Sequence, residues 1–315
     1  MELIKTLKIT SLKKYMEVEL KMKVFDVFLF GYELDLLEIR MNLLDPYVDY
    51  FVFSEGSKTF SGNNKDFLFK KTDNRFKKFK NKIIYTKIKE PTQDELYSKG
   101  LEYKVNKESF MRDTFYKDSI MDVLKKHCSD EDIIIWSDLD EVPNPEVIEQ
   151  LDSFYKSGTV YNFAQDNYQA ALNWFETSGT ITSQTRDTDY GPEGPRWVGT
   201  KMCDFATVKK YTMTQMRQEL PKEENSRIYP GGWHWSTVGS NEKGTMYDRV
   251  LKKIKSSAHT ELNNEKLLSE LKSRIDRGVS PLGQDNASYE EVSFDEERFP
   301  EYLIKNKEKY SYLLK

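Results

Sequence analysis

The chain has 315 residues, of which 38% are hydrophobic, 13% are aromatic and 32% are charged, and its formal net charge is −4. This length suits one large or two small domains, and the aromatic residues are numerous enough to build a packed core. A slightly acidic chain with only short lysine runs is not expected to bind nucleic acid.

Targeting and redox signals are weak. Residues 1–23 alternate apolar and lysine residues and lack the apolar stretch of a signal peptide, so we treat them as an N-terminal extension. No segment is apolar over the length that a membrane span needs. The two cysteines, Cys128 and Cys203, form neither a zinc-binding spacing nor a disulfide framework. We therefore expect a cytoplasmic protein with no transmembrane segment.

Strand and helix patterns alternate in the first half of the chain. Apolar runs bounded by turn residues predict strands at 24–30, 47–54, 82–88 and 133–136. Helical spacing of apolar residues predicts helices at 34–44 and 108–126, and Asn144-Pro145 predicts the start of another. This alternation is typical of an α/β fold with a mostly parallel sheet and right-handed crossovers.

The pattern changes after about residue 158. The sequence predicts a strand at 160–163, a loop at 176–196 and a helix at 251–276. We find no internal repeat and no convincing linker. The prediction is therefore a single domain over 24–315, with 24–157 as one half and 158–315 as an elaborated second half.

The most informative segment is Asp132 to Pro143, in which an apolar strand ends in Asp138, Asp140 and Glu141. In open α/β sheets ligands bind beyond the carboxyl ends of the strands, so these carboxylates should lie at the edge of a cleft. An Asp-x-Asp pair in this position can hold Mg²⁺ or Mn²⁺, which prefer carboxylate and phosphate oxygens. The alternative is an acidic turn that caps the next helix.

The pattern Asp-x-Asp is common, and this chain contains it three times, as Asp130/Asp132, Asp138/Asp140 and Asp187/Asp189. The first copy lies in a polar turn before the strand and the third lies in a predicted loop. Only the middle copy ends an apolar strand, which makes it the candidate metal site.

Other residues suit phosphate or sugar binding. His234 follows Pro-Gly-Gly and stands between two tryptophans, so it is either a packed core histidine or a metal or phosphate ligand. Arg112 and Lys117 lie on the helix before the acidic strand and could contact a diphosphate, although Lys117 and Asp113 are also spaced to form a pair on the helix surface. The chain lacks a phosphate loop, a dinucleotide-binding glycine motif and a nucleophile elbow.

Several blocks together suggest a family. They occur in order at 33–40, 48–55, 59–62, 132–143, 197–199, 211–213 with Arg217, 232–236 and 253–261. The chain resembles glycosyltransferase family 17, the family of the β-1,4-mannosyl-glycoprotein β-1,4-N-acetylglucosaminyltransferases.

This resemblance implies a GT-A-like fold, with a Rossmann-like, mostly parallel sheet flanked by helices. Residues 24–157 would form the nucleotide-sugar half and 158–315 the acceptor half. The implied activity is a metal-dependent inverting transfer of N-acetylglucosamine or another hexose from a UDP-sugar to a glycan or other hydroxyl acceptor, with Mn²⁺ or Mg²⁺ as cofactor.

The resemblance also implies roles for single residues. The implied metal ligands are Asp138, Asp140 and His234. The implied donor contacts are Glu55, Arg112, Lys117, Asp138, Arg217 and Trp235, with Glu55 on the nucleoside and Arg217 on the diphosphate or the acceptor. The catalytic base stays open among Glu141, Asp166, Glu193 and Glu219.

Two features depart from the family pattern. Family members tend to carry arginine where this chain has Lys117, which removes a bidentate phosphate contact. The absent membrane anchor favours a microbial or viral enzyme that builds another glycan. Two alternatives remain: a haloacid-dehalogenase-type phosphatase, because Asp138 to Val142 also fits its motif, and a non-catalytic carbohydrate-binding protein.

Overall fold

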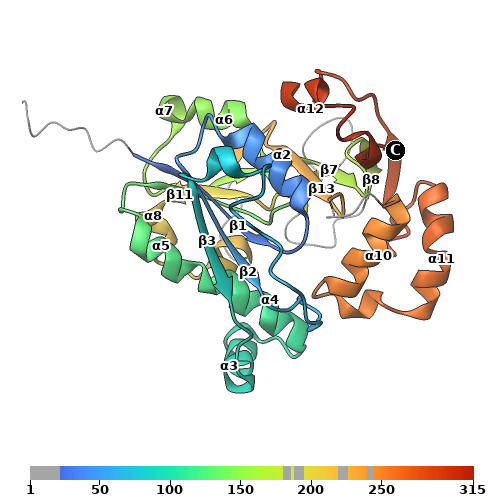
Figure 1. Cartoon of the computed structure of the whole chain (residues 1–315), viewed down its shortest axis with the longest axis horizontal. Coiled ribbons are helices and arrows are strands. Elements are labelled where there is room, and N and C mark those ends of the chain that lie inside the picture. Colours follow the sequence, from blue (N-terminus) through green and yellow to red (C-terminus); the bar gives the residue numbers. More distant parts are fainter. Residues whose placement is uncertain (1–21, 180–185, 188–194, 219–225, 240–243) are drawn as a thin grey trace, which may run out of the picture.

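The computed structural model describes residues 22–179, 186–187, 195–218, 226–239 and 244–315, which Figure 1 shows in colour. Side chains are described in the same ranges except at 186, 187 and 218. Within these ranges, none of the helices combines the length and the apolar character needed to cross a bilayer.

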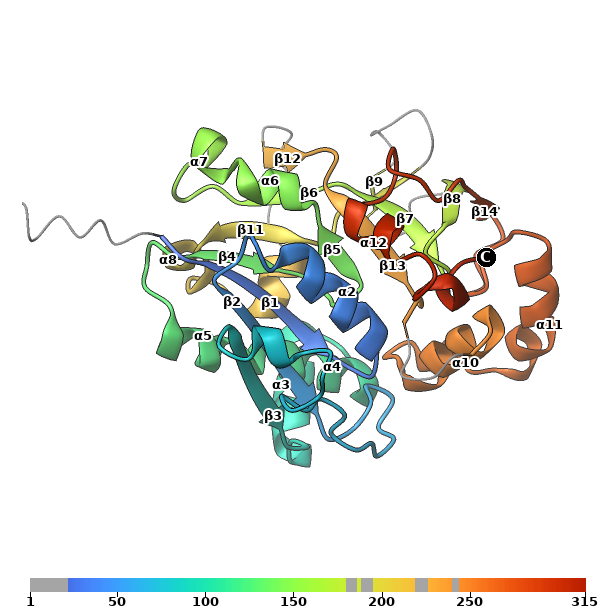
Figure 2. The same cartoon turned by 45° about the horizontal axis from the view of Figure 1, so that its top comes forward.

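The larger layer is a seven-stranded sheet with the strand order β12-β6-β11-β4-β1-β2-β3 (Figure 2). Its strands are β1 (Val24–Phe30), β2 (Tyr50–Gly56), β3 (Ile83–Ile88), β4 (Ile133–Trp136), β6 (Tyr161–Phe163), β11 (Lys201–Asp204) and β12 (Arg227–Ile228). β3, β2, β1 and β4 run parallel, and β11 is antiparallel to β4. The carboxyl ends of β1, β2 and β4 therefore meet at one edge.

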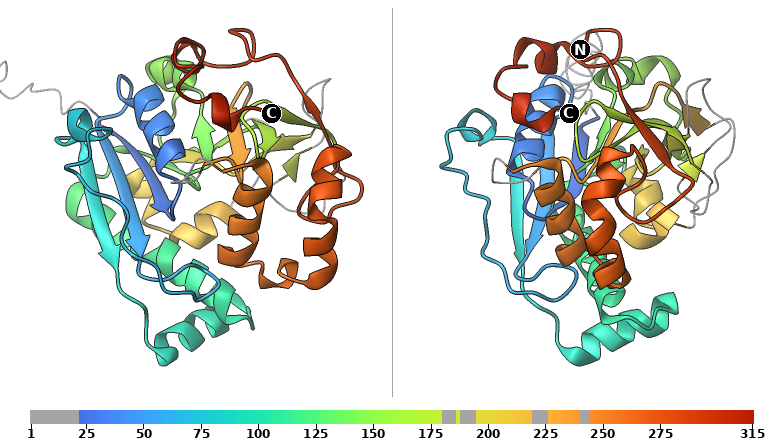
Figure 3. Two further views of the ribbon diagram at one scale, coloured as in Figure 1. Left: turned by 45° about the vertical axis from the view of Figure 1, so that its right-hand side comes forward. Right: turned by 90° about the vertical axis from the view of Figure 1, so that its right-hand side faces the viewer.

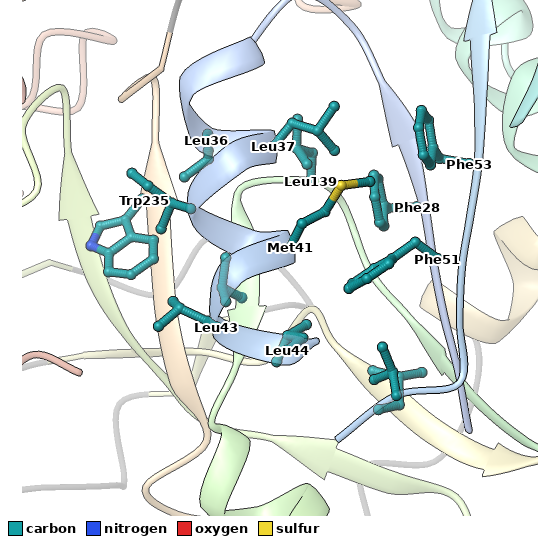
Figure 4. Packing of buried hydrophobic residues seen from close by; sticks show 14 of the residues in the cluster. Phe28, Leu36, Leu37, Met41, Leu43, Leu44, Phe51, Phe53, Leu139 and Trp235 are labelled. Carbon is teal, nitrogen blue, oxygen red and sulfur yellow. The ribbon is translucent and has the colours of Figure 1, made fainter. Parts of the chain in front are cut away.

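Helices cover both faces of the parallel half, which explains why its strands are almost continuously apolar. Alternate residues of β1 point to opposite faces, so Phe28 packs under α2 (Leu34–Leu44) and Val27 packs in the cluster that contains the helices of the other face. Those are α4 (Glu108–Ser119) and α5 (Met121–His127). Figure 4 shows Met41 of α2 beside Phe28 and Phe51.

A second, mostly antiparallel sheet has the order β14-β8-β7-β10-β9, and β13 joins β7 to β5. Its strands are β5 (Glu141–Pro143), β7 (Gln165–Gln169), β8 (Trp174–Ser178), β9 (Arg186–Asp187), β10 (Arg196–Trp197), β13 (Gly232–Ser236) and β14 (Ser288–Glu291). The pairing of β13 with β5 sets His234 opposite Glu141. Two segments about ninety residues apart in the chain thus meet directly after the acidic turn.

The C-terminal helices lie beside this second sheet (Figures 2 and 3). α10 (Met246–Ser256) and α11 (Glu265–Asp276) pack on each other and on Trp174 in one hydrophobic cluster. α12 (Glu301–Lys305) and the final turn return to α2, where Leu303 and Leu313 join the core of the large sheet.

The structure confirms the predicted α/β class and is consistent with the GT-A-like arrangement. Two predicted helices are wrong in extent: 108–126 is divided at Ile120 into α4 and α5, and 251–276 is interrupted because Ser257 is extended. The remaining helices are short or peripheral: α3 (Gln93–Tyr103), α6 (Pro145–Glu149), α7 (Leu151–Phe154), α8 (Phe205–Val208) and α9 (Met213–Gln218).

Candidate active site

The acidic turn that follows β4, from Asp138 to Glu141, is held in place by the buried side chain of Arg40. Arg40 of α2 donates from Nη1 to the carbonyl oxygens of Asp138, Leu139 and Glu141, at 3.0, 3.1 and 3.0 Å. Its charge is balanced by Asp26 of β1 at 2.6 Å, and both side chains are fully buried. The backbone of the turn is thus fixed by a charged donor that solvent does not reach.

Arg40 and Asp26 are not among the residues predicted for the site from the sequence, although a signal was present. Asp26 interrupts an otherwise apolar strand, and a buried carboxylate requires a buried partner. Arg40 stands on the same helix as the apolar residues that face the core. An acidic residue inside a core strand could therefore have indicated the ion pair.

Glu141 anchors the other side of the turn and is fully buried. Arg217 of α9 binds both of its oxygens, and the distance from Nη1 to Oε2 is 2.7 Å. The indole nitrogen of Trp197 donates to Oε1 at 2.5 Å, and the amide of Asp138 donates to Oε2 at 3.0 Å. Glu141 therefore orients Arg217 and Trp197 toward the turn.

Gly199 leaves the space that this carboxylate occupies, since a Cβ there would lie 2.2 Å from Oε1 of Glu141. We expect Gly199→Ala to lower the free energy of unfolding by about 1–3 kcal/mol through overpacking. It should also reduce any activity that depends on this site, because Arg217 would lose its fixed partner. Urea unfolding and initial rates measure the two effects, and a variant equal to the wild type in both would show that Glu141 moves without cost.

Asp138 faces cations. Its Oδ2 lies 2.8 Å from Arg217 and its Oδ1 lies 3.9 Å from Lys117, which also pairs with Asp113 at 2.8 Å. Burial acts to raise the pKa of Asp138, but Arg217 and Lys117 hold that pKa well below its usual range. Asp138 is therefore ionised and faces two cations, Arg217 and Lys117.

Asp140, Glu141 and His234 form the compact group with metal-binding chemistry: one ligand atom from each lies within 4.8 Å of the others. The sequence predicts Asp138 as a metal ligand, but this group contains Glu141 and not Asp138. The carboxylate of Asp138 faces Arg217 and Lys117. Of the three, Glu141 already binds Arg217 through both oxygens. Asp140 and His234 are the members with ligand atoms to spare.

His234 has the properties of a neutral ligand. Its ring stacks on Trp197 with centroids 4.3 Å apart, and its buried Nδ1 has no hydrogen-bond partner among the described residues. Burial lowers the pKa of His234 below its usual value, so the imidazole is unprotonated near neutral pH. A neutral imidazole that lies beside Asp140 and has an unpartnered Nδ1 among the described residues fits a divalent cation of the Mn²⁺ type.

Lys253 of α10 completes the charged set, and the sequence reasoning assigned it no role. Its Nζ lies 3.3 Å from Oδ2 of Asp140. Burial acts to lower the pKa of Lys253, but the carboxylate of Asp140 and neighbouring groups raise it above the usual value, so the side chain stays charged. The sequence signal was only its place in the block 253–261.

A pocket opens beside the turn. Its walls come from the ends of β1 and β2, from the loop around Lys58 to Lys65, and from Asp138, Asp140 and Lys253. The loop is tied to α10, because the amide of Ser61 donates to the carbonyl of Ser256 at 3.2 Å. The pocket thus lies where the sheet topology predicts a ligand, with the acidic turn as one wall.

Three residues that were predicted to contact the donor, Glu55, Arg112 and Trp235, are not among the described residues that line the pocket. Glu55 is fully buried, accepts from Lys65 at 2.6 Å and Tyr85 at 2.7 Å, and is not among the described residues that line the pocket. Arg112 pairs with Glu90 at 2.8 Å and donates to the carbonyl oxygen of Phe60 in the loop at 3.0 Å, and it is not among the described residues that line the pocket.

Trp235 is a core residue. It is fully buried, its ring stacks on Trp233 with centroids 5.5 Å apart, and Figure 4 shows it beside Leu36 and Leu43. Side chains alternate along β13, so when His234 faces the acidic turn its neighbour must face the opposite side. The structure therefore places Trp235 in the core, on the side of β13 opposite His234.

Of the remaining base candidates, the structure describes only Asp166, which is not among the described residues that line the pocket. Asp166 pairs with Arg196 at 3.1 Å and lines a different groove with Tyr229 and Trp233. Glu193 and Glu219 lie outside the described residues.

Comparison with known proteins adds one match. The family model described as Glycosyltransferase family 17 matches residues 2–184, which is more than half of the chain. This segment contains Asp26, Arg40 and the acidic turn, whereas Arg217, His234 and Lys253 follow it. No curated protein matches the chain.

Proposed function

The chain belongs to glycosyltransferase family 17 and is a glycosyltransferase, and from this premise we propose that it transfers N-acetylglucosamine or another hexose from a UDP-sugar to a hydroxyl group of a glycan or other acceptor. The observation that carries this proposal is the acidic turn itself, which follows a parallel strand, lines a pocket and lies beside His234, a histidine whose Nδ1 has no hydrogen-bond partner among the described residues. Membership of a transferase family decides against the phosphatase and the non-catalytic sugar-binding alternatives.

In this proposal the nucleotide occupies the pocket at the ends of β1 and β2. Residues 24–157 would supply most of its wall, and α10 of the second half would close it through Lys253 and Ser256. We therefore propose a nucleotide half and an acceptor half for the chain. Residues of both halves line the donor pocket.

Asp140 and His234 would hold a divalent cation, Mn²⁺ or Mg²⁺. Such a cation supplies Lewis-acid stabilisation of the negative charge that develops on a departing diphosphate. Arg217 and Lys117 would add positive charge beside the diphosphate, on the side of Asp138. Glu141 would hold Arg217 in position. Lys117 would act as a single charge where an arginine would form two parallel hydrogen bonds.

Inversion needs a base for the acceptor hydroxyl. We assign Glu141 to anchoring Arg217, because both of its oxygens already accept charged or indole donors in a fully buried position. Asp166, Glu193 and Glu219 stay as candidates for the base, and single substitution to glutamine or asparagine in a transfer assay would rank them.

The test is a panel of UDP-sugars with Mn²⁺, scored by UDP release. We expect EDTA to reduce the rate about 100-fold or more and added Mn²⁺ or Mg²⁺ to restore it, because the metal contributes several kcal/mol to the transition state. UDP with Mn²⁺ should also raise the melting temperature, since a ligand that binds only the folded state stabilises it. Equal rates with and without EDTA would contradict the metal role.

A further inference from the structure

We propose that the Lys253–Asp140 ion pair competes with the divalent cation, so that Lys253 leaves Asp140 for the diphosphate when cation and nucleotide bind together. Lys253 would thereby weaken the binding of the cation alone and strengthen the binding of the nucleotide. This inference rests on the proposed function, because it assumes a cation at Asp140 and a nucleotide in the adjacent pocket.

The geometry places Lys253 at the boundary between the two ligands. Its ammonium lies 3.3 Å from Oδ2 of Asp140, the carboxylate with ligand capacity to spare. The same side chain lines the pocket with Asp138 and Tyr32 and is 30% exposed. It can therefore swing within the pocket without leaving a packed core.

Each carboxylate of the turn already faces a cation. Asp138 faces Arg217 and Lys117, Glu141 faces Arg217, and Asp140 faces Lys253. A divalent cation on Asp140 would stand close to the Lys253 ammonium, and the two would repel each other in this poorly solvated position. The negative charge of a diphosphate would attract both the cation and the Lys253 ammonium. Each ligand, cation or nucleotide, should therefore raise the binding affinity of the other by the same factor.

A purely structural role for this ion pair would have a different signature. α10, which carries Lys253, is held in place by the buried side chains of Val250 and Ile254. The carboxyl end of α10 is also bound to the loop, at Ser61. Loss of a merely structural contact would weaken folding or weaken both ligands together. Opposite effects on the cation and the nucleotide would not follow from it.

The experiment compares the full chain with Lys253→Met, which keeps the length of the side chain and removes its charge. Binding of Mn²⁺ alone is measured from the electron paramagnetic resonance signal of free Mn²⁺, and binding of UDP at saturating Mn²⁺ is measured by calorimetry. We expect Mn²⁺ alone to bind roughly tenfold more tightly and UDP to bind roughly tenfold more weakly than in the wild type, as for loss of one close charge pair.

Two further variants serve as controls. Lys255→Met removes the same charge from the same helix at an exposed position outside this pocket, and it should leave both affinities unchanged. Lys253→Arg keeps the charge and should retain weak binding of Mn²⁺ alone. Melting curves of each variant confirm that folding is intact.

The outcomes separate the two proposals. If the wild type binds both ligands and Lys253→Met matches it, or loses affinity for both, the role of Lys253 is overturned while the proposed function stands. If the wild type binds neither Mn²⁺ nor UDP, the metal-dependent, UDP-using function fails and the role of Lys253 fails with it.

Discussion

Asp140→Asn is expected to reduce transfer about 1,000-fold at saturating donor while leaving the fold intact. The change removes the negative charge from the carboxylate that stands beside His234, so a divalent cation would lose its strongest ligand. A loss of this size corresponds to about 4 kcal/mol of transition-state stabilisation, within the range that a Lewis-acid cation supplies. UDP release gives the rate, and the Mn²⁺ affinity should fall in parallel.

The chain provides a matched control in its first Asp-x-Asp copy. Asp130 is exposed and pairs with Lys209 at the surface, so Asp130→Asn should change both stability and rate very little. If Asp140→Asn keeps more than about a tenth of the wild-type rate, the assignment of the cation to Asp140 is wrong.

Arg40→Met is expected to lower the free energy of unfolding by about 3–5 kcal/mol, because it leaves the carboxylate of Asp26 buried without its partner. The same change frees the carbonyl oxygens of Asp138, Leu139 and Glu141 from their shared donor. The turn should then lose its fixed geometry and the enzyme most of its activity. Urea unfolding and initial rates measure the two effects.

A double variant distinguishes positioning from stability. Asp26→Leu with Arg40→Met removes both charges, so it should recover much of the lost stability, as replacing a buried ion pair by apolar residues often does. It should not recover activity, because the carbonyl oxygens of the turn still lack their donor. Recovery of both would show that Arg40 serves only as the counter-ion of Asp26. Arg75→Met, which breaks the half-exposed pair with Asp73, controls for loss of an arginine and should cost at most about 1 kcal/mol.

Much of the site was predictable because it depends on local patterns. The apolar strand from Ile133 to Trp136, the Asp-x-Asp that follows it, and the preceding alternation of strands and helices predict a ligand site at one edge of the sheet. His234 was also recognisable, because its glycine-tryptophan surroundings are unusual. These signals depend on strand length, turn chemistry and side-chain alternation, which neighbouring residues encode.

By itself, then, the sequence determined the α/β class, the position of the acidic turn and a short list of polar residues. Only the tertiary structure decided which members of that list meet: Glu141 with Arg217, Asp140 with Lys253, and Trp235 with the core. The physical reason is that partners far apart in the chain are chosen by strand pairing and by the balance of buried charge. Strand pairing and the balance of buried charge do not produce a periodic pattern in the sequence around the residues that they bring together.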